Sequence, residues 1–531
     1  MNRNNTWSFT LIVIGVIFLV NLFAQKLFVR FDLTENERYS ISDVTRDILA
    51  DIDEPITVKV YYSENFPRQL ISVKQYVLDM LNEYRAYAGS SLEYEFIPIS
   101  GENQELEQEA MSYGVQPVQA NITESDEIKV QRIYLGIVFL YGDQKEVIPF
   151  AQQIEQLEYD MTGAIKKLSL GSLPKIGWLT GHGEQSLGKE GVARATGEIQ
   201  KNYELVELNL SSEDQIPQDI NTLILTGASA EFNDQDLYKL DQFILRGGRL
   251  GLFLNKKIID IQNQYMPVQD NRTNLFFFLE HFGVKYGNQI LLDKTSYQVQ
   301  AMQNLGFLQI PVAMDYPFAP RISNLNEDNP IVNRLNELGF FFVNEVSQTG
   351  DTSRVVFTPL MHTSDMTGFA MPDQRTRSIN ISAGQQFPDY MYREGSKTIA
   401  AVLEGEHSSW FGSTRPDSIS FPEMHLAESI TPTVMVALGN ATFTSQQFMV
   451  PASLTFLLNT VDWLHDRNGL ISIRSKNVQP SQLDEMTSGK RQALKWINIL
   501  LAPMLIVLFG VIRWYLRNKS KNLAGALDHE K

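Results

Sequence analysis

Two ionisable side chains, those of His182 and Glu184, stand two residues apart in the turn Thr180-Gly181-His182-Gly183-Glu184. An imidazole and a carboxylate held in one turn could act together as general acid and base, or could bind a polar ligand. A second reading assigns both side chains to backbone groups that a sharp turn leaves without partners. The sequence leaves both readings open, and the turn is the first candidate ligand-binding site.

A similar group of ionisable residues follows another apolar stretch. Glu404 and Glu406 stand beside His407, directly after a strand predicted over 397–403. As in the first turn, these side chains could bind a ligand or could pair with backbone groups. Together with Gly227, which ends a further apolar run, the candidate ligand-binding residues are His182, Glu184, Gly227, Glu404 and Glu406.

The elements that would position these residues alternate between strands and helices. The apolar residues Ile176, Trp178 and Leu179 predict a short buried strand that enters the first turn. Further along, the sequence predicts a helix over 189–201, strands over 204–208 and 222–226, a helix over 234–245 and a strand over 249–254. This alternation indicates a parallel sheet with helices on both faces. Ligands bind at the carboxyl ends of the strands in such sheets, where His182, Glu184 and Gly227 would lie.

Several kinds of chemistry are excluded by what the sequence lacks. It has no cysteine, which excludes disulfides, thiolate zinc sites and cysteine nucleophiles. It contains no GxxxxGK[ST] phosphate loop and no GxSxG nucleophile elbow. The seven histidines are scattered without an HExxH motif, so no zinc site is expected. The formal charge of -17 argues against general nucleic-acid binding. We expect a chain that is not an enzyme, with no catalytic residue, metal or cofactor.

The part of the chain before residue 171 predicts a separate α+β domain. Its order is a strand over 56–62, a helix over 69–88, a strand over 92–99 and a helix over 102–113, and then a hairpin formed by 130–141 and 146–149. This β-α-β-then-hairpin order is that of a thioredoxin-like domain, but without cysteine it has no redox chemistry. Ser42 is the expected N-cap of a helix over 43–52, and 154–168 is expected to be a connecting helix.

Two uncharged stretches near the ends of the chain are long enough to suggest membrane spans. Residues 4–25 match the roughly 20 residues that cross a bilayer, with a cleaved signal peptide as the alternative. Residues 496–512 are shorter and precede a basic tail, with a buried core helix as the alternative. The positive-inside rule then places both termini in the cytoplasm and the bulk of the chain outside the bacterial inner membrane.

The expected organisation is therefore an α/β chain between two anchors. An N-terminal transmembrane anchor (1–30) precedes the thioredoxin-like domain (31–170). A larger Rossmann-like or glutamine-amidotransferase-like parallel-sheet domain (171–476) follows, with strand-rich insertions over 286–395 where proline is frequent. Its last elements are a strand over 433–438 and a helix over 454–466. A linker, the second span and the basic tail (477–531) complete the chain.

Separated motifs resemble the GldG-like family of auxiliary proteins to bacterial ABC transporters, named after the gliding-motility transporter. The segments that carry the resemblance include Phe31-Asp32-Leu33-Thr34, Arg38-Tyr39-Ser40, the Thr180 to Glu184 turn, Gly247-Gly248-Arg249, Val402-Leu403-Glu404-Gly405 and Asn459-Thr460-Val461-Asp462-Trp463-Leu464. The resemblance implies a membrane-anchored, non-catalytic accessory subunit in the periplasm. Its implied partners are an ABC-type permease, an ABC ATPase acting through that permease, the lipid bilayer and an envelope substrate.

The chain departs from the family pattern after the strand over 433–438. Where members carry a Gly-Asp-Ser-Asp-like acidic turn, this chain has Gly439-Asn440-Ala441-Thr442. A carboxylate or metal site at that turn therefore does not carry over. The amidotransferase-like fold uses a cysteine nucleophile, which this chain lacks. Two alternatives stay open, a membrane-anchored module that binds a ligand such as carbohydrate, and a hydrolase acting through His182 and nearby carboxylates.

Overall fold

The computed structural model describes residues 40–476 with gaps at 65, 68–69, 101–102, 125–126, 152–153, 189–190, 260–266, 306–307, 351–353, 373–378, 386 and 468, and also residues 15, 495, 500, 504 and 507–514. No helix within this part of the chain is long and apolar enough to cross a membrane. Except for residues 15, 500, 504 and 507–512, the predicted spans over 4–25 and 496–512 lie outside the described residues. The chain divides into two compact units, residues 1–478 and 479–531, and residues 507–514 of the second unit are helical.

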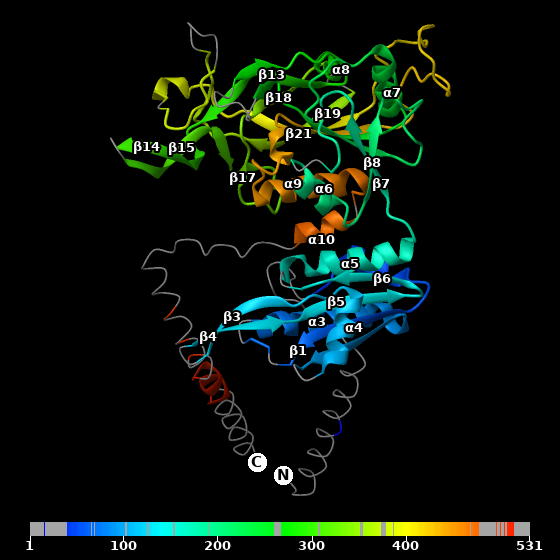
Figure 1. The fold of residues 1–531 in the computed structure, drawn as a ribbon, viewed down its shortest axis with the longest axis vertical. Helices are drawn as coiled ribbons and strands as arrows, with labels where there is room; N and C mark the ends of the chain where they lie inside the picture. The colour runs from blue at the N-terminus through cyan, green and yellow to red at the C-terminus, as the bar shows by residue number, and fades with distance from the viewer. Residues whose placement is uncertain are drawn as a thin grey trace, which may run out of the picture. The chain divides into compact units, whose positions relative to one another are not determined.

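The N-terminal domain is built on a four-stranded sheet in the order β2-β1-β5-β6. Figure 1 labels β1, β5 and β6 of this sheet and the helices α3, α4 and α5 of the same domain. Strands β1 (Ile56–Ser63) and β2 (Leu92–Ile99) are parallel, and β5 (Leu135–Tyr141) and β6 (Gln144–Ile148) form an antiparallel hairpin beside β1. The predicted β-α-β-then-hairpin order is therefore present.

Helices cover both faces of this sheet because its strands alternate two sets of apolar side chains. Ile56, Val58 and Val60 face a core shared with α3 (Ile71–Ala88) and α5 (Ile154–Leu170). Tyr61 points to the other face, toward the core with Ala110 of α4 (Gln104–Tyr113). The short helix α2 (Asp43–Ala50) begins at the predicted N-cap, where the Ser42 hydroxyl accepts a hydrogen bond from the Thr45 N–H at 3.2 Å.

The single strand predicted over 130–141 is wrong, because two strands share that stretch. β4 (Glu127–Ile133) pairs with β3 (Val118–Glu124), whereas β5 returns to the main sheet. The change of partner occurs at Tyr134, whose N–H donates to the Ser63 hydroxyl at 2.9 Å. A continuous apolar run shows that strands are present but does not show where the pairing partner changes.

The second domain is organised around an eight-stranded sheet in the order β16-β19-β21-β22-β10-β9-β7-β8. Five neighbouring strands are parallel: β22 (Thr433–Leu438), β10 (Arg249–Phe253), β9 (Thr222–Thr226), β7 (Lys175–Thr180) and β8 (Glu204–Asn209). The remaining three strands each pair antiparallel with their neighbours, namely β21 (Thr398–Gly405), β19 (Val355–His362) and β16 (Asn324–Leu325). The parallel arrangement predicted for the strands of 175–254 is therefore present, whereas the sheet as a whole is mixed.

Helices cover both faces of the large sheet, as predicted. One face packs against α6 (Ala193–Ile199) and α9 (Pro451–His465). The opposite face packs against α7 (Asp234–Leu245) and α8 (Leu275–His281). Adjacent residues of β7 point to opposite cores, Trp178 to the first and Leu179 to the second. Such strands are buried on both sides, which is why their sequences are continuous apolar runs.

Strand-rich insertions occupy the predicted region and have a core of their own. β13 (Val284–Asp293), β18 (Asn344–Gln348) and β20 (Thr367–Phe369) form one small sheet, and β14 (Ser296–Leu305), β15 (Leu308–Ile322) and β17 (Leu338–Gly339) form another. A short hairpin of β11 (Lys257–Ile259) and β12 (Val268–Asp270) follows β10.

The Gly247-Gly248-Arg249 motif joins two layers of this domain. The Arg249 guanidinium donates to the carbonyls of Leu464 and His465 at 2.7 and 2.6 Å. Both carbonyls belong to the last turn of α9, where backbone acceptors lack partners within the helix. Arg249 therefore caps α9, and the described contacts give this part of the family resemblance a structural role.

Candidate functional site

A cleft of about 340 Å³ opens at the carboxyl ends of the parallel strands. Its lining comes from the segments that leave four of them: Gly183 and Gln185 after β7, Thr226 and Gly227 at the end of β9, Asn255 and Lys257 after β10, and Thr442, Thr444 and Ser445 after β22. Ile258, Ile259 and Phe448 add apolar surface. The cleft is where the strand-end rule places a ligand.

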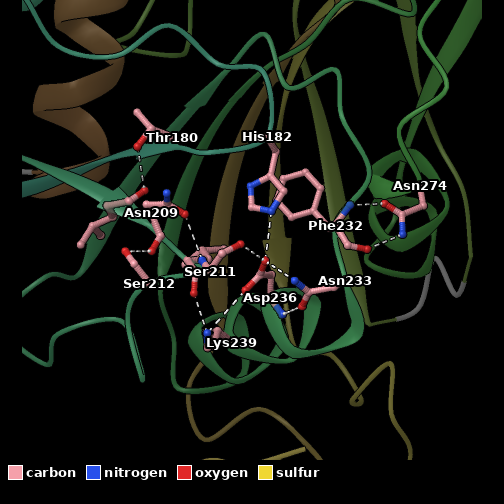
Figure 2. A network of polar contacts seen from close by, with 12 residues as sticks. Thr180, His182, Asn209, Ser211, Ser212, Phe232, Asn233, Asp236, Lys239 and Asn274 are labelled. Atoms are coloured by element: carbon pink, nitrogen blue, oxygen red, sulfur yellow. Dashed lines mark hydrogen bonds and ion pairs between the residues drawn. The ribbon is translucent and has the colours of Figure 1, made fainter.

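His182 lies beside this cleft but its side chain turns away from it. The side chain is buried, and its ring stacks on Phe232 with ring centroids 3.7 Å apart (Figure 2). Its Nε2 lies 3.1 Å from a carboxylate oxygen of Asp236, in the first turn of α7. The imidazole is thereby engaged on α7, so Gly183 and Gln185 face the cleft in its place.

The backbone of His182 ties the turn to the segment after β9. The His182 carbonyl accepts hydrogen bonds from the N–H groups of Ser229 and Ala230, each at 2.8 Å. Its N–H donates to the Glu184 carboxylate at 2.6 Å. Burial raises the pKa of the Glu184 carboxyl, against the opposing effect of this backbone N–H. The Glu184 carboxylate therefore pairs with a backbone group of the turn, whereas the His182 imidazole bonds to a side chain of α7.

Asp236 is the centre of the buried polar network that holds His182 (Figure 2). One of its carboxylate oxygens also accepts from the Ser211 hydroxyl at 2.7 Å and from the Asn233 amide at 2.8 Å. Its backbone N–H donates to the side chain of Asn233, the N-cap of α7. Lys239, one turn later, lies 3.4 Å from the other carboxylate oxygen. The network fixes the start of α7 against the His182 turn.

The remaining candidate residues fall on two different edges of the sheet. Gly227 lines the cleft, as its place at the end of β9 predicts. Glu404 and Glu406 lie elsewhere, because β21 is antiparallel and Gly405 pairs with Thr433, the first residue of β22. Glu404 forms an ion pair with Arg467 at 3.0 Å, and Glu406 is exposed. The structure therefore does not bring these two carboxylates to the cleft.

The turn after β22 uses its amide side chain within the fold. The Asn440 side chain donates to the Phe341 carbonyl and accepts from the Phe443 N–H at 2.9 Å. Neighbouring Asn255 donates to the Phe342 carbonyl at 3.0 Å. Asn255 lines the cleft, as do the hydroxyls of Thr226 and Thr444, which lie 3.3 Å apart.

Sequence reasoning missed most of the lining residues. Asn255, Lys257, Thr442 and Thr444 carry no recognisable motif, and Asp236 stands 54 positions from the histidine that it holds. A usable signal was present, since the first residues after each parallel strand meet at one edge. Applying that rule to β10 and β22, and not only to β7 and β9, would have found the first four.

Gly183→Ala is expected to strain the wall of the cleft. Gly183 has φ +94°, and an added Cβ would lie 2.0 Å from the Ser229 hydroxyl oxygen. The left-handed backbone alone costs roughly 1–2 kcal/mol for a residue with a side chain. We expect a loss of at least that size in the free energy of unfolding, measured by denaturant titration. Adding Ser229→Ala to this variant should recover only the part of the loss that comes from the steric clash. A Gly183→Ala chain with the wild-type free energy of unfolding would contradict the argument.

His407 is expected to make the folded chain sensitive to acid. Burial lowers its pKa to about 4, and the nearby charges of His281 and Arg354 act in the same direction. The neutral imidazole is favoured in the fold, so stability is complete above pH 6.5 and falls as the unfolded chain takes up a proton between pH 6.5 and 4. The loss is about 3 kcal/mol over that window.

The measurement is urea unfolding of wild type and His407→Gln between pH 7.5 and 4. The variant should show a shallower decline, by about the same 3 kcal/mol. If the two profiles are parallel, His407 does not contribute to the acid sensitivity.

Comparisons with known proteins match both domains. The family described as "ABC-type uncharacterized transport system", an auxiliary-component family, matches residues 173–471, and a domain of unknown function matches 35–140. An uncharacterized protein of Borreliella burgdorferi (strain ATCC 35210) is 22% identical over 536 residues, covering 98% of this chain and 99% of its own. The solved mmIFT52 N-terminal domain is 13% identical with a TM-score of 0.33, covering 54% of this chain and 96% of that one.

The first of these matches spans more than half of the chain and contains the whole cleft. The solved structure is too distant to support an argument about this chain. On the strength of the family match, the chain belongs to the family of auxiliary components of ABC-type transport systems whose specific role is uncharacterized.

Proposed function

We propose that this chain is a non-catalytic accessory subunit of a gliding-motility-type, GldG-like ABC transporter in the bacterial inner membrane. In this proposal its two anchors lie against a separate permease, and its domains lie in the periplasm. ATP hydrolysis belongs to a partner ATPase that acts through the permease, because the chain has no phosphate loop. Family membership supports the transport role.

The observation that carries the proposal is the contact between α2 and α10 (Leu470–Lys476). These are the first and last helices of the two domains described over residues 40–476. Val44 of α2 packs against Leu470 and Ile473 of α10. The chain therefore enters at residue 40 and leaves at residue 476 at neighbouring places. The segments that lead to the two predicted spans therefore join this body at neighbouring places.

The first test is a mild-detergent purification of the full chain with mass spectrometry of the proteins that co-purify. We expect an ABC ATPase and a multi-span permease. The matched control replaces 496–512 with an unrelated apolar span of equal length, which keeps the membrane anchor but removes its specific contacts. Recovery of the wild-type chain without either subunit would overturn the proposed role.

The topology has its own test, because a chain without cysteine can be labelled at single introduced thiols. A membrane-impermeant maleimide should label Asp143→Cys, an exposed residue of the β5–β6 turn, in spheroplasts. It should label Ala526→Cys only after the cells are permeabilised. The reverse pattern would contradict a periplasmic body with a cytoplasmic tail.

A second candidate function, a membrane-anchored carbohydrate-binding module, is supported by the cleft. Hydroxyl and amide groups from Thr226, Asn255 and Thr444 line it beside the aromatic ring of Phe448. Such a mixture suits ligands that combine hydroxyl groups with apolar faces. Envelope glycans should then raise the thermal midpoint of the wild type but not of Thr444→Val. A hydrolase has less support, because the His182 side chain is buried and does not line the cleft.

A further inference from the structure

A buried carboxylate, that of Asp462 on α9, receives phenol hydroxyls from both domains. The Tyr203 hydroxyl, just before β8 in the same domain, donates to it at 2.8 Å. The Tyr159 hydroxyl, from α5 at the end of the N-terminal domain, lies 3.2 Å from each carboxylate oxygen. Tyr159 in turn accepts from the Asn202 amide at 2.8 Å. Tyr159 therefore joins the N-terminal domain to the second domain through hydrogen bonds, and Lys166 of α5 adds a long ion pair with Asp466 at 3.9 Å.

The neighbours of Tyr159 on α5 hold the helix to its own domain. The Glu158 carboxylate accepts from the Ser42 N–H at 2.6 Å and from the Thr45 hydroxyl at 2.9 Å. The Thr162 hydroxyl lies 2.6 Å from that of Tyr84. Because residues 158 and 162 bind the N-terminal domain, α5 moves with that domain, and Tyr159 alone among these residues contacts Asp462.

The rest of the junction consists of apolar contacts and of a close approach between Asn202 and α5. Its apolar part is Tyr159 with Leu470 and Ile473 of α10, against which Val44 packs. Asn202 lies so close to α5 that an added Cβ on Gly163 would meet its side-chain oxygen at 2.8 Å. Only residues 171–174 connect α5 to β7. Interfaces between domains that are small and polar permit relative motion.

We propose that the hydrogen bonds from Tyr159 to Asp462, here called the Asp462 latch, hold the N-terminal domain against the sheet domain. These bonds break together when the two domains separate. When closed, Tyr159 and Tyr203 share the carboxylate. When open, Tyr159 leaves and water solvates the exposed side of Asp462, which replaces the lost hydrogen bonds. Tyr203 remains with Asp462 in both states because the two belong to one domain. Because water can hydrogen-bond to the carboxylate in the open state, opening at Asp462 costs less free energy than exposing an apolar surface would. The opening is therefore reversible.

The test compares two substitutions that each remove one hydroxyl from the same carboxylate, Tyr159→Phe and Tyr203→Phe. Spin labels at Asp143→Cys and Glu213→Cys, both exposed, report the distance between the domains in the full-length, otherwise cysteine-free chain. Wild type should give one narrow distribution. Tyr159→Phe should shift the ratio of open to closed chains by about tenfold or more, since hydrogen bonds to charged groups are the strong ones. Tyr203→Phe should keep the wild-type distribution.

Gly163→Ala tests the same junction independently, because it adds a methyl group between α5 and Asn202. Alanine is the better helix former, so α5 itself should gain stability, whereas its methyl group should push Asn202 away and open the junction. A longer or broader distance distribution in this variant, without a fall in thermal midpoint, supports the latch. A wild-type distribution in both Tyr159→Phe and Gly163→Ala would overturn it. So would equal broadening by Tyr203→Phe, which would make Asp462 a general stabiliser.

Discussion

Asp236→Ala is expected to lower the free energy of unfolding by about 3–5 kcal/mol, the cost of removing one partner from a buried ionic network. The substitution leaves the buried His182 ring without its acceptor and the buried Lys239 without its counter-charge, whereas the exposed Ser211 and Asn233 can bond to water. Each unpaired buried group has its own desolvation cost. The first turn of α7 also loses the hydrogen bond from the Asn233 amide to the carboxylate, although the backbone N–H of residue 236 still bonds to the N-cap side chain.

The matched control is Asp234→Ala, in the same turn of α7 but exposed. Surface substitutions of this kind usually change stability by no more than about 0.5 kcal/mol. Asp236→Asn, which keeps the shape and some acceptors, should fall between the two. The measurement is equilibrium unfolding in urea, and equal losses for positions 234 and 236 would mean that the network does not hold the turn.

The sequence was sufficient to predict elements whose signals are local. The helix over 234–245 and the strand over 222–226 match α7 and β9, because both are predicted from patterns of neighbouring residues alone. The place of the cleft followed from the same alternation, since parallel strands bring their carboxyl ends to one edge. Gly227 was placed correctly for this reason.

What the sequence did not predict depends on distant partners. The apolar run of β21 looks the same whether the strand runs parallel or antiparallel, yet its direction decides on which edge Glu404 lies. The side-chain direction of His182 likewise depends on Asp236 and Phe232, which belong to a later helix and loop. A motif of chemically capable residues therefore indicated the right turn but not its role in the fold.

Trp178→Ala is expected to cost about 3–5 kcal/mol, the range for emptying a buried aromatic site. Trp178 is fully buried in the middle of β7, between β8 and β9, and it packs in the core with α6 and α9. Its indole N–H also donates to the Gln185 carbonyl at 2.8 Å. The same side chain therefore fills the core and fixes the segment that lines the cleft.

Trp178→Phe separates these two roles. Phenylalanine keeps most of the apolar volume but leaves the Gln185 carbonyl without the indole donor, so we expect a smaller loss of roughly 1–3 kcal/mol. Hydrogen exchange should then quicken at the amides of 183–188 more than at β9, to which the indole N–H makes no hydrogen bond. Uniform quickening across β7 and β9 would instead mean that the indole N–H has no separate part in shaping the cleft. The wall of the cleft would then depend on core packing alone.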